Sequence, residues 1–594
     1  MTMETQIADL AIVGAGWHGL AAAKSALALD PSVNLVVLDS AASVGGVWAE
    51  ERLYAELRTN NLLGSYEYGD FPMRDNIPGL VKPGEHMSGR AMHEYLKAYA
   101  AHFGILDKIK LNCKVDSVKY CEGDDGWGKE WFIKCTTTTE PGHEKSNTIR
   151  TRKLILATGL TSQPRIPTFS GQQSFGAPLF HAKQFALYQD TLFAKPSNDN
   201  DNTGGQHEGA RDDHTPITVL GGSKSAWDTV YACASKGHRV NWVIRASGTG
   251  PAWVSPAAVF SPFNLLLESL PLVRALGWFS PCIWVSHPIR NFLHGTWLGC
   301  IIVRLFWACL EWDMVRVNRY SDHEETAKLR PWFKPICMGT AVHIADVERL
   351  EPYQVVLSNG GDRLDTRALI LCTGWKVSPG IRFLPDGTEQ EMGFPWAADP
   401  IDQELIRQAR KDIYTRLPIL HTGPANRTYH TKDAEGQNEP VLHPFRLARF
   451  IVPPGLWDDH SIAFLGTVTT FNTSFIAEVQ ALWALVYLNH GSELHHHHHH
   501  HQDKESIVSE TALHTEFCAL RSPAGHGVRT ADFVFEAMPY LDLLLGDLGL
   551  RTARKGSWWE DLFVPHRPRD YAGLVEEWKA RRSSSQEGRK IKDT

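Results

Sequence analysis

Three glycines near the N-terminus have the spacing of a phosphate-binding turn. Gly14, Gly16 and Gly19 follow an apolar run and precede an alanine-rich one, so they would join a strand to a helix. The first glycine permits a tight turn, the second lets a pyrophosphate approach the backbone, and the third lets the helix pack on the strand. The helix N-terminus would face the phosphates, and Asp39, ending the next apolar run, would accept hydrogen bonds from a ribose. The pattern predicts a dinucleotide site; a chance glycine turn in a parallel sheet is the alternative.

A second turn of the same kind begins at Gly221. Its third glycine is replaced by the small residue Ala226, and Arg245 stands where the first unit has its acid. An acid there would repel a 2′-phosphate, whereas an arginine pairs with one. Lys224 adds positive charge nearby. The second site is therefore expected to prefer NADPH over NADH, unless Arg245 is only a solvated charge at a strand end.

The elements that must hold these turns repeat one plan. Each turn lies in a strand–helix–strand unit, and each unit is followed later by an apolar strand that ends in a small residue, threonine and glycine. The segments are Asp9–Val13, Leu20–Leu29 and Asn34–Leu38, then Ile217–Leu220, Asp228–Ser235 and Arg239–Ile244, with the strand ends at Ala157-Thr158-Gly159 and Cys372-Thr373-Gly374. A helix at Met92–Phe103 and strands near Cys113–Val118 and Trp131–Cys135 complete the first unit. The pattern predicts an α/β fold with two Rossmann-like dinucleotide-binding domains.

Composition excludes several classes of function. The 594 residues are 43% hydrophobic and 21% charged, with a formal net charge of −7, so no broad basic surface for nucleic acid is expected. The ten cysteines contain no CxxC pair, which argues against a disulfide framework, a thioredoxin-type site and a metal site. The N-terminus does not resemble a signal peptide, so a cytoplasmic protein is expected. The 20 tryptophans fit either a large core or an aromatic substrate pocket.

Three stretches depart from the plan. Residues 196–215 are polar, which predicts a linker. His495–His501 lie in a low-complexity loop, 491–505; such a histidine run could bind metal but is more often unstructured. Residues 262–312 are unusually apolar, within a helical insertion expected at about 255–330. There His294–Leu310 could form a helix that Arg304 interrupts. This length is at the short limit for a membrane span, so a buried lid helix or a peripheral membrane contact is favoured.

Several short runs resemble the class B flavin-dependent monooxygenases, which include flavin-containing and Baeyer–Villiger monooxygenases. The matching runs are Gly45-Gly46-Val47-Trp48, Leu57-Arg58-Thr59-Asn60 with Asp70-Phe71-Pro72-Met73, the two strand ends at 157–159 and 372–375, the spacing of Phe175, His181 and Phe185, and Phe464–Thr467 with Phe471–Leu485. The fingerprint glycine falls one residue early, at Gly176, and Ala177 stands in its place. The apolar insertion and the C-terminal region look like fungal members of secondary metabolism.

The resemblance implies FAD in the first unit and NADPH in the second. In this family NADPH reduces FAD, O2 adds to the flavin C4a, and the resulting (hydro)peroxyflavin gives one oxygen atom to the substrate. A large apolar or aromatic small molecule is expected, such as a polyketide, by hydroxylation or Baeyer–Villiger oxidation. Oxidation of nitrogen or sulfur, a flavoprotein reductase without oxygen insertion, and a non-catalytic flavin-binding protein stay open as alternatives.

The resemblance also assigns site residues. Asn60 would donate a hydrogen bond near the flavin–oxygen adduct, His181 would orient NADPH from the linker between the nucleotide domains, and Trp48 would stack near the flavin or line the substrate path. A loop-capping asparagine, a packed histidine and a core tryptophan are the respective alternatives. The residues expected to bind the two cofactors are Gly14, Gly16, Gly19, Asp39, Gly46, Trp48, Asn60, Val115, Thr158, Gly159, Gly221, Ser223, Lys224, Arg245, Thr373 and Gly374.

The expected domains follow from these assignments. Residues 1–175 form the first part of the FAD-binding domain, and 176–375 form the NADPH-binding domain with the linker and the apolar insertion. Residues 376–594 return to the FAD domain and add the C-terminal region.

Overall fold

The computed structural model describes residues 5–592 except for a set of internal gaps. These gaps are 74–76, 78–83, 124–127, 141–142, 195–214, 249–257, 261–264, 319–339, 377, 423–441, 495–502 and 522–526. Nearly all of the predicted linker at 196–215 and the whole histidine run at 495–501 lie outside the described residues.

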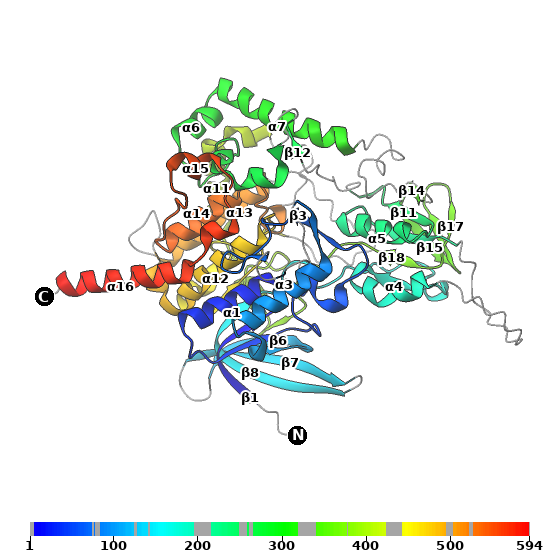
Figure 1. The fold of residues 1–594 in the computed structure, drawn as a ribbon, viewed down its shortest axis with the longest axis horizontal. Coiled ribbons are helices and arrows are strands. Elements are labelled where there is room, and N and C mark those ends of the chain that lie inside the picture. The colour runs from blue at the N-terminus through cyan, green and yellow to red at the C-terminus, as the bar shows by residue number, and fades with distance from the viewer. Residues whose placement is uncertain are drawn as a thin grey trace, which may run out of the picture.

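The first sheet contains the N-terminal unit. Its strand order is β19-β6-β7-β8-β1-β2-β5, and β20 also pairs with β8. The strands are β1 (Thr5–Val13), β2 (Leu35–Leu38), β5 (Ile109–Lys110), β6 (Cys113–Glu122), β7 (Lys129–Glu140), β8 (His143–Leu156), β19 (Arg382–Leu384) and β20 (Ile462–Phe464). The central strands β2, β1 and β8 are parallel, whereas β6, β7 and β8 form an antiparallel meander. Strands from both ends of the chain therefore build one sheet, at the bottom of Figure 1.

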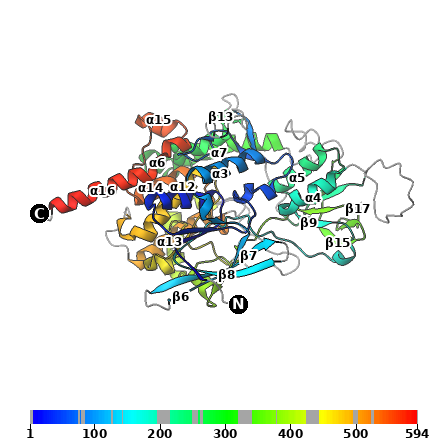
Figure 2. The same cartoon turned by 60° about the horizontal axis from the view of Figure 1, so that its bottom comes forward.

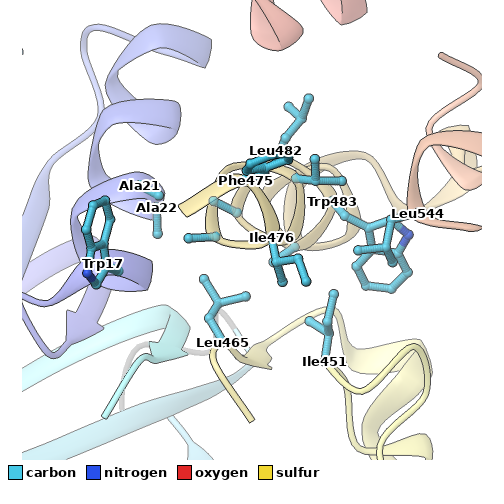
Figure 3. Packing of buried hydrophobic residues seen from close by; sticks show 14 of the residues in the cluster. Trp17, Ala21, Ala22, Ile451, Leu465, Phe475, Ile476, Leu482, Trp483 and Leu544 are labelled. Atoms are coloured by element: carbon cyan, nitrogen blue, oxygen red, sulfur yellow. The ribbon is translucent and has the colours of Figure 1, made fainter. Parts of the chain in front are cut away.

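Three helices cover this sheet. They are α1 (Trp17–Leu29), α3 (Gly89–His102) and α12 (Thr473–His490). Every residue of α12 from Ser474 to Leu488 is buried, which is typical of a helix enclosed by protein. Figure 3 shows Ile476 and Trp483 of α12 between Ala22 of α1 and Leu544 of α14 (Ala537–Asp547). The C-terminal half thus supplies the core on which the first helix packs.

The second sheet contains the other glycine turn. Its order is β14-β11-β10-β18-β9, and its pairings are all parallel. The strands are β9 (Leu179–His181), β10 (Ile217–Leu220), β11 (Val240–Ile244), β14 (Thr340–Ile344) and β18 (Leu369–Leu371), covered by α4 (Phe185–Phe193) and α5 (Lys224–Ser235). A small antiparallel meander, β15 (Val347–Glu351), β16 (Gln354–Leu357) and β17 (Arg363–Asp365), lies beside it. The predicted α/β fold with two such units is confirmed.

A short helix and a long helix of the apolar region meet at a sharp bend. They are α6 (Pro288–Gly295) and α7 (Trp297–Asn318), at the top of Figure 1. The expected interruption at Arg304 is wrong, because α7 continues through that exposed residue, and the helix breaks at Thr296 instead. Among the described residues no single helix is long and apolar enough to cross a membrane; α6 and α7 pass that test only as a pair bent by 92°.

The outer face of α7 is apolar. Trp297, Leu305 and Trp312 are 77%, 60% and 69% exposed, and they follow helical spacing along one side. The opposite side, with Val303 and Leu310, is buried. Of the two alternatives predicted for this helix, a buried lid helix and a peripheral membrane contact, the first is wrong in that only one side of α7 is covered.

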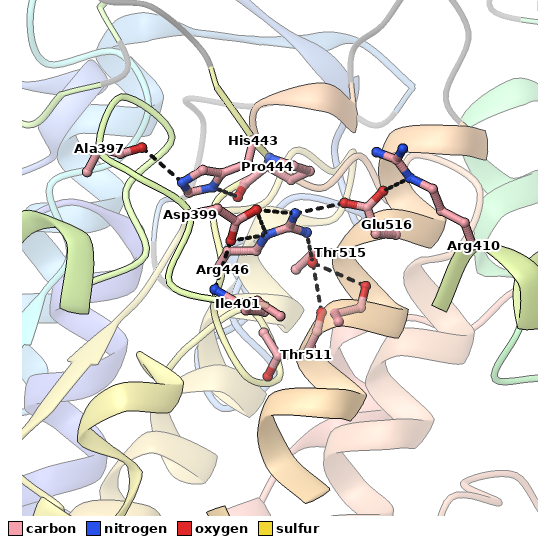
Figure 4. Close-up of polar contacts among 11 residues, drawn as sticks. Ala397, Asp399, Ile401, Arg410, His443, Pro444, Arg446, Thr511, Thr515 and Glu516 are labelled. Atoms are coloured by element: carbon pink, nitrogen blue, oxygen red, sulfur yellow. Dashed lines mark hydrogen bonds and ion pairs between the residues drawn. The ribbon is translucent and has the colours of Figure 1, made fainter. Parts of the chain in front are cut away.

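A buried arginine ties the C-terminal helices to the return segment. Arg446 pairs with Asp399 at 2.7 Å and with Glu516 at 2.8 Å, and Arg410 contacts Glu516 from the other side at 2.6 Å (Figure 4). Glu516 lies on α13 (Lys504–Arg521) and Arg410 on α11 (Gln403–Arg416). Because Arg446 and Glu516 are both buried, removing either would leave the charge of the other uncompensated, which is strongly destabilising. The terminal helices α15 (Trp558–Phe563) and α16 (Leu574–Lys592) follow, and α16 projects away from the rest (Figure 2).

Candidate functional site

The two glycine turns have matching geometry. Gly14 has φ +111°, and a Cβ added there would lie 2.4 Å from the carbonyl oxygen of Ala157. Gly221 has φ +145°, and its added Cβ would lie 2.3 Å from the carbonyl oxygen of Cys372. Each turn therefore presses against the end of the neighbouring strand that closes its unit, β8 or β18. Neither position tolerates a side chain, which is the reason for glycine in both.

The remaining glycines of the first turn also meet backbone. A Cβ at Gly19 would lie 1.8 Å from the carbonyl oxygen of Gly14, so this glycine is needed by the turn itself. A Cβ at Gly46 would lie 3.1 Å from the Cα of Gly16, which brings the second predicted run against the first. In the second unit Ala226 is fully buried at the third position.

Both helices that follow these turns start without a side-chain cap. Gly16 precedes α1 and the exposed Ser223 precedes α5, and neither helix has an acidic residue in its first turn. The first amide groups of a helix otherwise need partners. An anionic phosphate fits both positions, because the amide groups and the helix dipole favour negative charge there.

The residues at the strand ends differ in the two units. Asp39 follows β2, and its carboxylate accepts hydrogen bonds from the amides of Ala15 at 2.6 Å and Ala41 at 2.8 Å. Burial raises the pKa of Asp39, and these hydrogen bonds act in the opposite direction. Arg245 follows β11 and is exposed, with no ion pair to any described residue. Asp39 and Arg245 thus occupy the same position in the two units, at the end of the second strand, but Asp39 is bonded to the turn and Arg245 is exposed.

Lys224 faces the first unit. Its ammonium group contacts the carbonyl oxygen of Arg58 at 3.1 Å and the carboxylate of Asp228. Tyr54 reaches the same carboxylate at 3.5 Å. Lys224 therefore has partners within the protein, whereas Arg245, the other cation predicted to flank a 2′-phosphate, has no ion pair to a described residue.

Two crossing segments connect the sheets and run side by side. Thr158 and Gly159 begin the first, and Thr373 and Gly374 begin the second. Pro164 and Trp375 form a bridge between them, and the amide of Arg165 donates to the carbonyl of Gly374 at 3.0 Å. Both crossing glycines have positive φ, with open space where a Cβ would be, so they bend the chain beside a free volume.

His181 binds the second of these two crossing segments through its imidazole ring. It is 1% exposed, and its Nδ1 accepts from the amide of Lys183 at 3.1 Å. Nε2 must then carry the proton, and it donates to the carbonyl of Gly374 at 3.1 Å. The ring also packs edge-on against Trp375 with centroids 4.9 Å apart. Burial lowers the pKa of His181 to about 4, with the cations of Lys183 and Arg52 acting in the same direction.

Strand β3 (Arg58–Leu62) lies where all parts of the chain meet, in the middle of Figure 1. It pairs with β4 (His86–Ser88) on one edge. Lys224 of the second unit contacts the carbonyl of Arg58, as described above. The side-chain amide of Asn61 donates to the carbonyl of Phe471, just before α12, at 3.2 Å. The amide of Leu62 donates to Glu268 of the apolar region at 2.9 Å. Asn60, between these contacts, is exposed.

Aromatic side chains pack beside the first turn. Trp48 is 8% exposed, and the ring of Tyr66 packs on Trp17 with centroids 4.7 Å apart. Burial raises the pKa of Tyr66. Val115 is buried on β6, two residues beyond Cys113, whose amide donates to the carbonyl of Asp39 at 2.8 Å. Trp48 and Val115 belong to the two different buried clusters that pack on β1.

The sequence reasoning missed two polar residues at the start of α12. Asn472 is 0% exposed, and neither its amide nitrogen nor its amide oxygen has a hydrogen-bond partner among the described residues. The buried hydroxyl of Ser474 also lacks one there. Leaving a buried polar group unsatisfied costs about 1–3 kcal/mol, so these atoms fit a bound group that both donates and accepts, such as the pyrimidine ring of a flavin. The run Asn-Thr-Ser before an apolar helix was the available signal.

The proteins that this chain resembles in sequence are flavin-dependent monooxygenases. The model of the family "FMO-like: Flavin-binding monooxygenase-like" matches residues 8–193. The chain is 30% identical to an FAD-dependent monooxygenase of Pyrenophora dematioidea, over 92% of this chain and 98% of that protein. It is 29% identical to the FAD-dependent monooxygenase rstn6 of Aspergillus nomiae, over 97% and 98%.

Solved structures of monooxygenases share the fold. The polycyclic ketone monooxygenase of the fungus Thermothelomyces thermophila is similar with a TM-score of 0.56 and 14% identity, over 92% of this chain and 88% of that one. Cyclohexanone monooxygenase from Rhodococcus sp. Phi1 is similar with a TM-score of 0.51 and 13% identity, over 92% and 98%. Together with the full-length relatives, the two turns and the fold show that the chain belongs to the FAD-dependent monooxygenases.

Proposed function

We propose that this enzyme uses NADPH and O2 to insert one oxygen atom into a large apolar or aromatic organic molecule. The observation that carries the proposal is β3, where the first unit, the second unit, the segment before α12 and the apolar region all contact one strand. Its central side chain, Asn60, is exposed at this junction. A residue that acts on FAD, NADPH and the substrate together must lie where the regions that bind these three molecules meet.

Each cofactor has its own turn in this proposal. Gly14, Gly16, Gly19 and Asp39 hold FAD together with Gly46, Trp48, Val115, Thr158 and Gly159. Gly221, Ser223, Lys224, Arg245, Thr373 and Gly374 hold NADPH. Arg245 supplies the free cation for the 2′-phosphate, since it is exposed and without an ion pair to a described residue. The NADP-bound cyclohexanone monooxygenase with the same fold supports the choice of nucleotide. Residues 1–175, 176–375 and 376–594 remain the proposed domains.

Reduced flavin supplies the activation of O2 when it is bound. The residues of this chain position and shield that chemistry. Asn60 donates a hydrogen bond toward the reacting oxygen. The buried side-chain amide of Asn472 forms its hydrogen bonds with the flavin ring. Trp48 and Tyr66 exclude water from the same side, which matters because water promotes loss of peroxide without product. His181 holds the two crossing segments together and would orient NADPH without itself changing charge near neutral pH.

The test uses purified holoenzyme and two variants of Asn60. Asn60→Asp keeps the size but replaces the N–H donors by acceptors, and Asn60→Ala removes the group. Both are expected to release more peroxide for each NADPH oxidised, whereas Asn291→Ala, an exposed asparagine on α6, leaves the ratio unchanged. Unchanged coupling in both Asn60 variants would remove this residue from the proposed site.

The alternatives give different products. Mass and connectivity of products formed under ¹⁸O2 distinguish insertion into a carbon–carbon bond, hydroxylation, and oxidation of nitrogen or sulfur. A flavoprotein reductase would oxidise NADPH with a substrate but incorporate no ¹⁸O. The polycyclic ketone monooxygenase shares the fold and favours a bulky ring system as the first substrate class to try, and the fungal relatives favour a secondary metabolite such as a polyketide.

We also propose that the apolar face of α7 contacts a lipid surface. Its exposed residues include tryptophans near both ends, and tryptophan prefers the membrane–water interface. A helix with one buried side and one apolar exposed side can lie in that interface without crossing it. Trp297→Ser combined with Leu305→Ser is expected to reduce co-sedimentation with phosphatidylcholine vesicles, and Glu311→Gln on the same helix serves as the control. Equal sedimentation of all three proteins would contradict the proposal.

A further inference from the structure

Two charged side chains, Lys224 and Glu268, bind backbone groups at the two ends of β3. The carbonyl of Leu57 accepts from the amide of Gly89 and the amide of Leu63 donates to the carbonyl of Glu85, so β3 is bonded to the β4 segment at its two ends. The carbonyl of Arg58 and the amide of Leu62 have partners elsewhere. The ammonium of Lys224 contacts Arg58, and the carboxylate of Glu268 accepts from Leu62. Asn60 lies between the two contacts in sequence, in the stretch where the pairing of β3 with β4 shifts register.

Glu268 reaches β3 from the apolar region. It belongs to the 3-10 turn Leu267–Leu272, which follows β13 (Leu265–Leu266). Its carboxylate accepts from the amide of Leu62 at 2.9 Å and from the hydroxyl of Ser65 at 3.3 Å. An ionised carboxylate is an acceptor only, which suits two donors on the same oxygen. Burial raises the pKa of Glu268, while these two hydrogen bonds favour its charged form.

The turn that carries Glu268 is itself fixed to α7. Leu267 packs in one buried cluster with Leu310 of α7 and Val259 of β12 (Ala258–Val259). The amide of Phe260 donates to the carboxylate of Asp313, also on α7, at 2.6 Å. A continuous path of packed residues therefore runs from α7 through Glu268 to β3.

We propose that Glu268 is a positioning residue for oxygenation, which holds β3 so that Asn60 keeps its place and which links that place to the apolar region. The inference rests on the proposed function of Asn60. Glu268 touches backbone and a serine hydroxyl and is not itself assigned a contact with cofactor or substrate. Its effect is on the geometry of the strand, where a displacement of about 1 Å can cost roughly a hundredfold in rate.

The experiment compares Glu268→Ala, Glu268→Gln and Glu311→Ala in the full-length holoenzyme. Glu311 is an exposed carboxylate on α7 and is the matched control. Hydrogen exchange of the peptide covering residues 58–66 measures β3 directly and does not depend on activity. Loss of a hydrogen bond to a charged acceptor is expected to speed exchange at Leu62 by about tenfold or more in Glu268→Ala. Gln can still accept from that amide, so Glu268→Gln should restore most of the protection.

The second measurement is the peroxide released for each NADPH oxidised. It should rise at least about twofold in Glu268→Ala, recover in Glu268→Gln and stay unchanged in Glu311→Ala. Unchanged exchange in Glu268→Ala overturns the inference, as does faster exchange with unchanged peroxide release. Equal effects of Glu311→Ala would also overturn it, because they would indicate general loosening. If the wild-type enzyme incorporates no ¹⁸O, the proposed function fails instead, and the exchange data still report whether Glu268 holds β3.

Discussion

Protonation of His181 should loosen the crossing between the two sheets. In the fold its Nδ1 accepts the amide of Lys183 and its Nε2 donates to Gly374, so the ring is neutral. A second proton would break the Lys183 contact and place a charge beside Arg52 and Lys183. The pKa of His181 is lowered from 6.5 to about 4, which means that the unfolded chain binds the proton first as the pH falls.

The size of this effect follows from the two pKa values. Stability contributed by the neutral ring is complete above pH 6.5 and is lost as the pH falls from 6.5 toward 4. At pH 5 the loss is about 2 kcal/mol, and at pH 7.5 it is about 0.1 kcal/mol, since each pKa unit corresponds to about 1.4 kcal/mol. His181→Gln cannot titrate, so it should lack this part of the pH dependence.

Urea unfolding followed by tryptophan fluorescence at pH 7.5 and pH 5 measures the difference. Wild-type protein should lose about 2 kcal/mol more than His181→Gln between the two values. The other buried histidines are present in both proteins and cancel in the comparison. His102→Gln, an exposed histidine on α3, is the control and should follow the wild type. Parallel pH dependence of His181→Gln and the wild type would refute the reasoning.

Four further substitutions test the remaining assignments. Gly221→Ala should raise the KM for NADPH by roughly tenfold or more with FAD content unchanged, and Gly14→Ala should lower FAD content; loss of FAD in both would mean that the turns are not independent. Arg245→Ala should raise the KM for NADPH by roughly ten- to a hundredfold, and Arg239→Ala, at the other end of β11, is the control; an equal rise for NADH would exclude a 2′-phosphate contact. Burial raises the pKa of Glu478 from 4.5 to about 8, so wild-type stability should fall as the pH rises through this range and Glu478→Gln should not follow it; a shared decline would assign the effect to other groups.

Local patterns predicted the two strand–helix–strand units. Their strands are short apolar runs, their turns are marked by glycine, and both signals lie within a few dozen residues. The predicted strand Ile217–Leu220 has the observed bounds of β10. Helix α5 begins at Lys224, four residues before the predicted start at Asp228, because the turn residues already adopt helical geometry. The same local signals could not show that Lys224 turns toward β3.

The resemblance predicted that the C-terminal part returns to the FAD domain, but the residues alone did not show which strand it would join. Strand β20 pairs with β8 across the whole second unit, and nothing in its three apolar residues identifies that partner. The unpartnered amide of Asn472 becomes visible only when the surrounding helices bury it. The interruption expected at Arg304 failed for a related reason, since a charge on the exposed side of a helix costs little. The spacing of apolar residues and the residues of a turn can be read from a short stretch of sequence. Burial depends on the assembled fold and cannot.

Strand β3 shows why the site is harder to predict than the sheets. Its sequence, Arg-Thr-Asn-Asn-Leu, is polar and unfavourable for an isolated strand. Hydrogen bonds from Met87 at 3.1 Å to the hydroxyl of Thr59, and from Asn61 to Phe471, supply what intrinsic preference does not. The position of Asn60 therefore depends on segments more than 400 residues away in sequence. If so, substitutions at Glu268 and at Asn61 should increase peroxide release without touching the reacting oxygen, and the double substitution should exceed the sum of the single effects because both hold the same short strand.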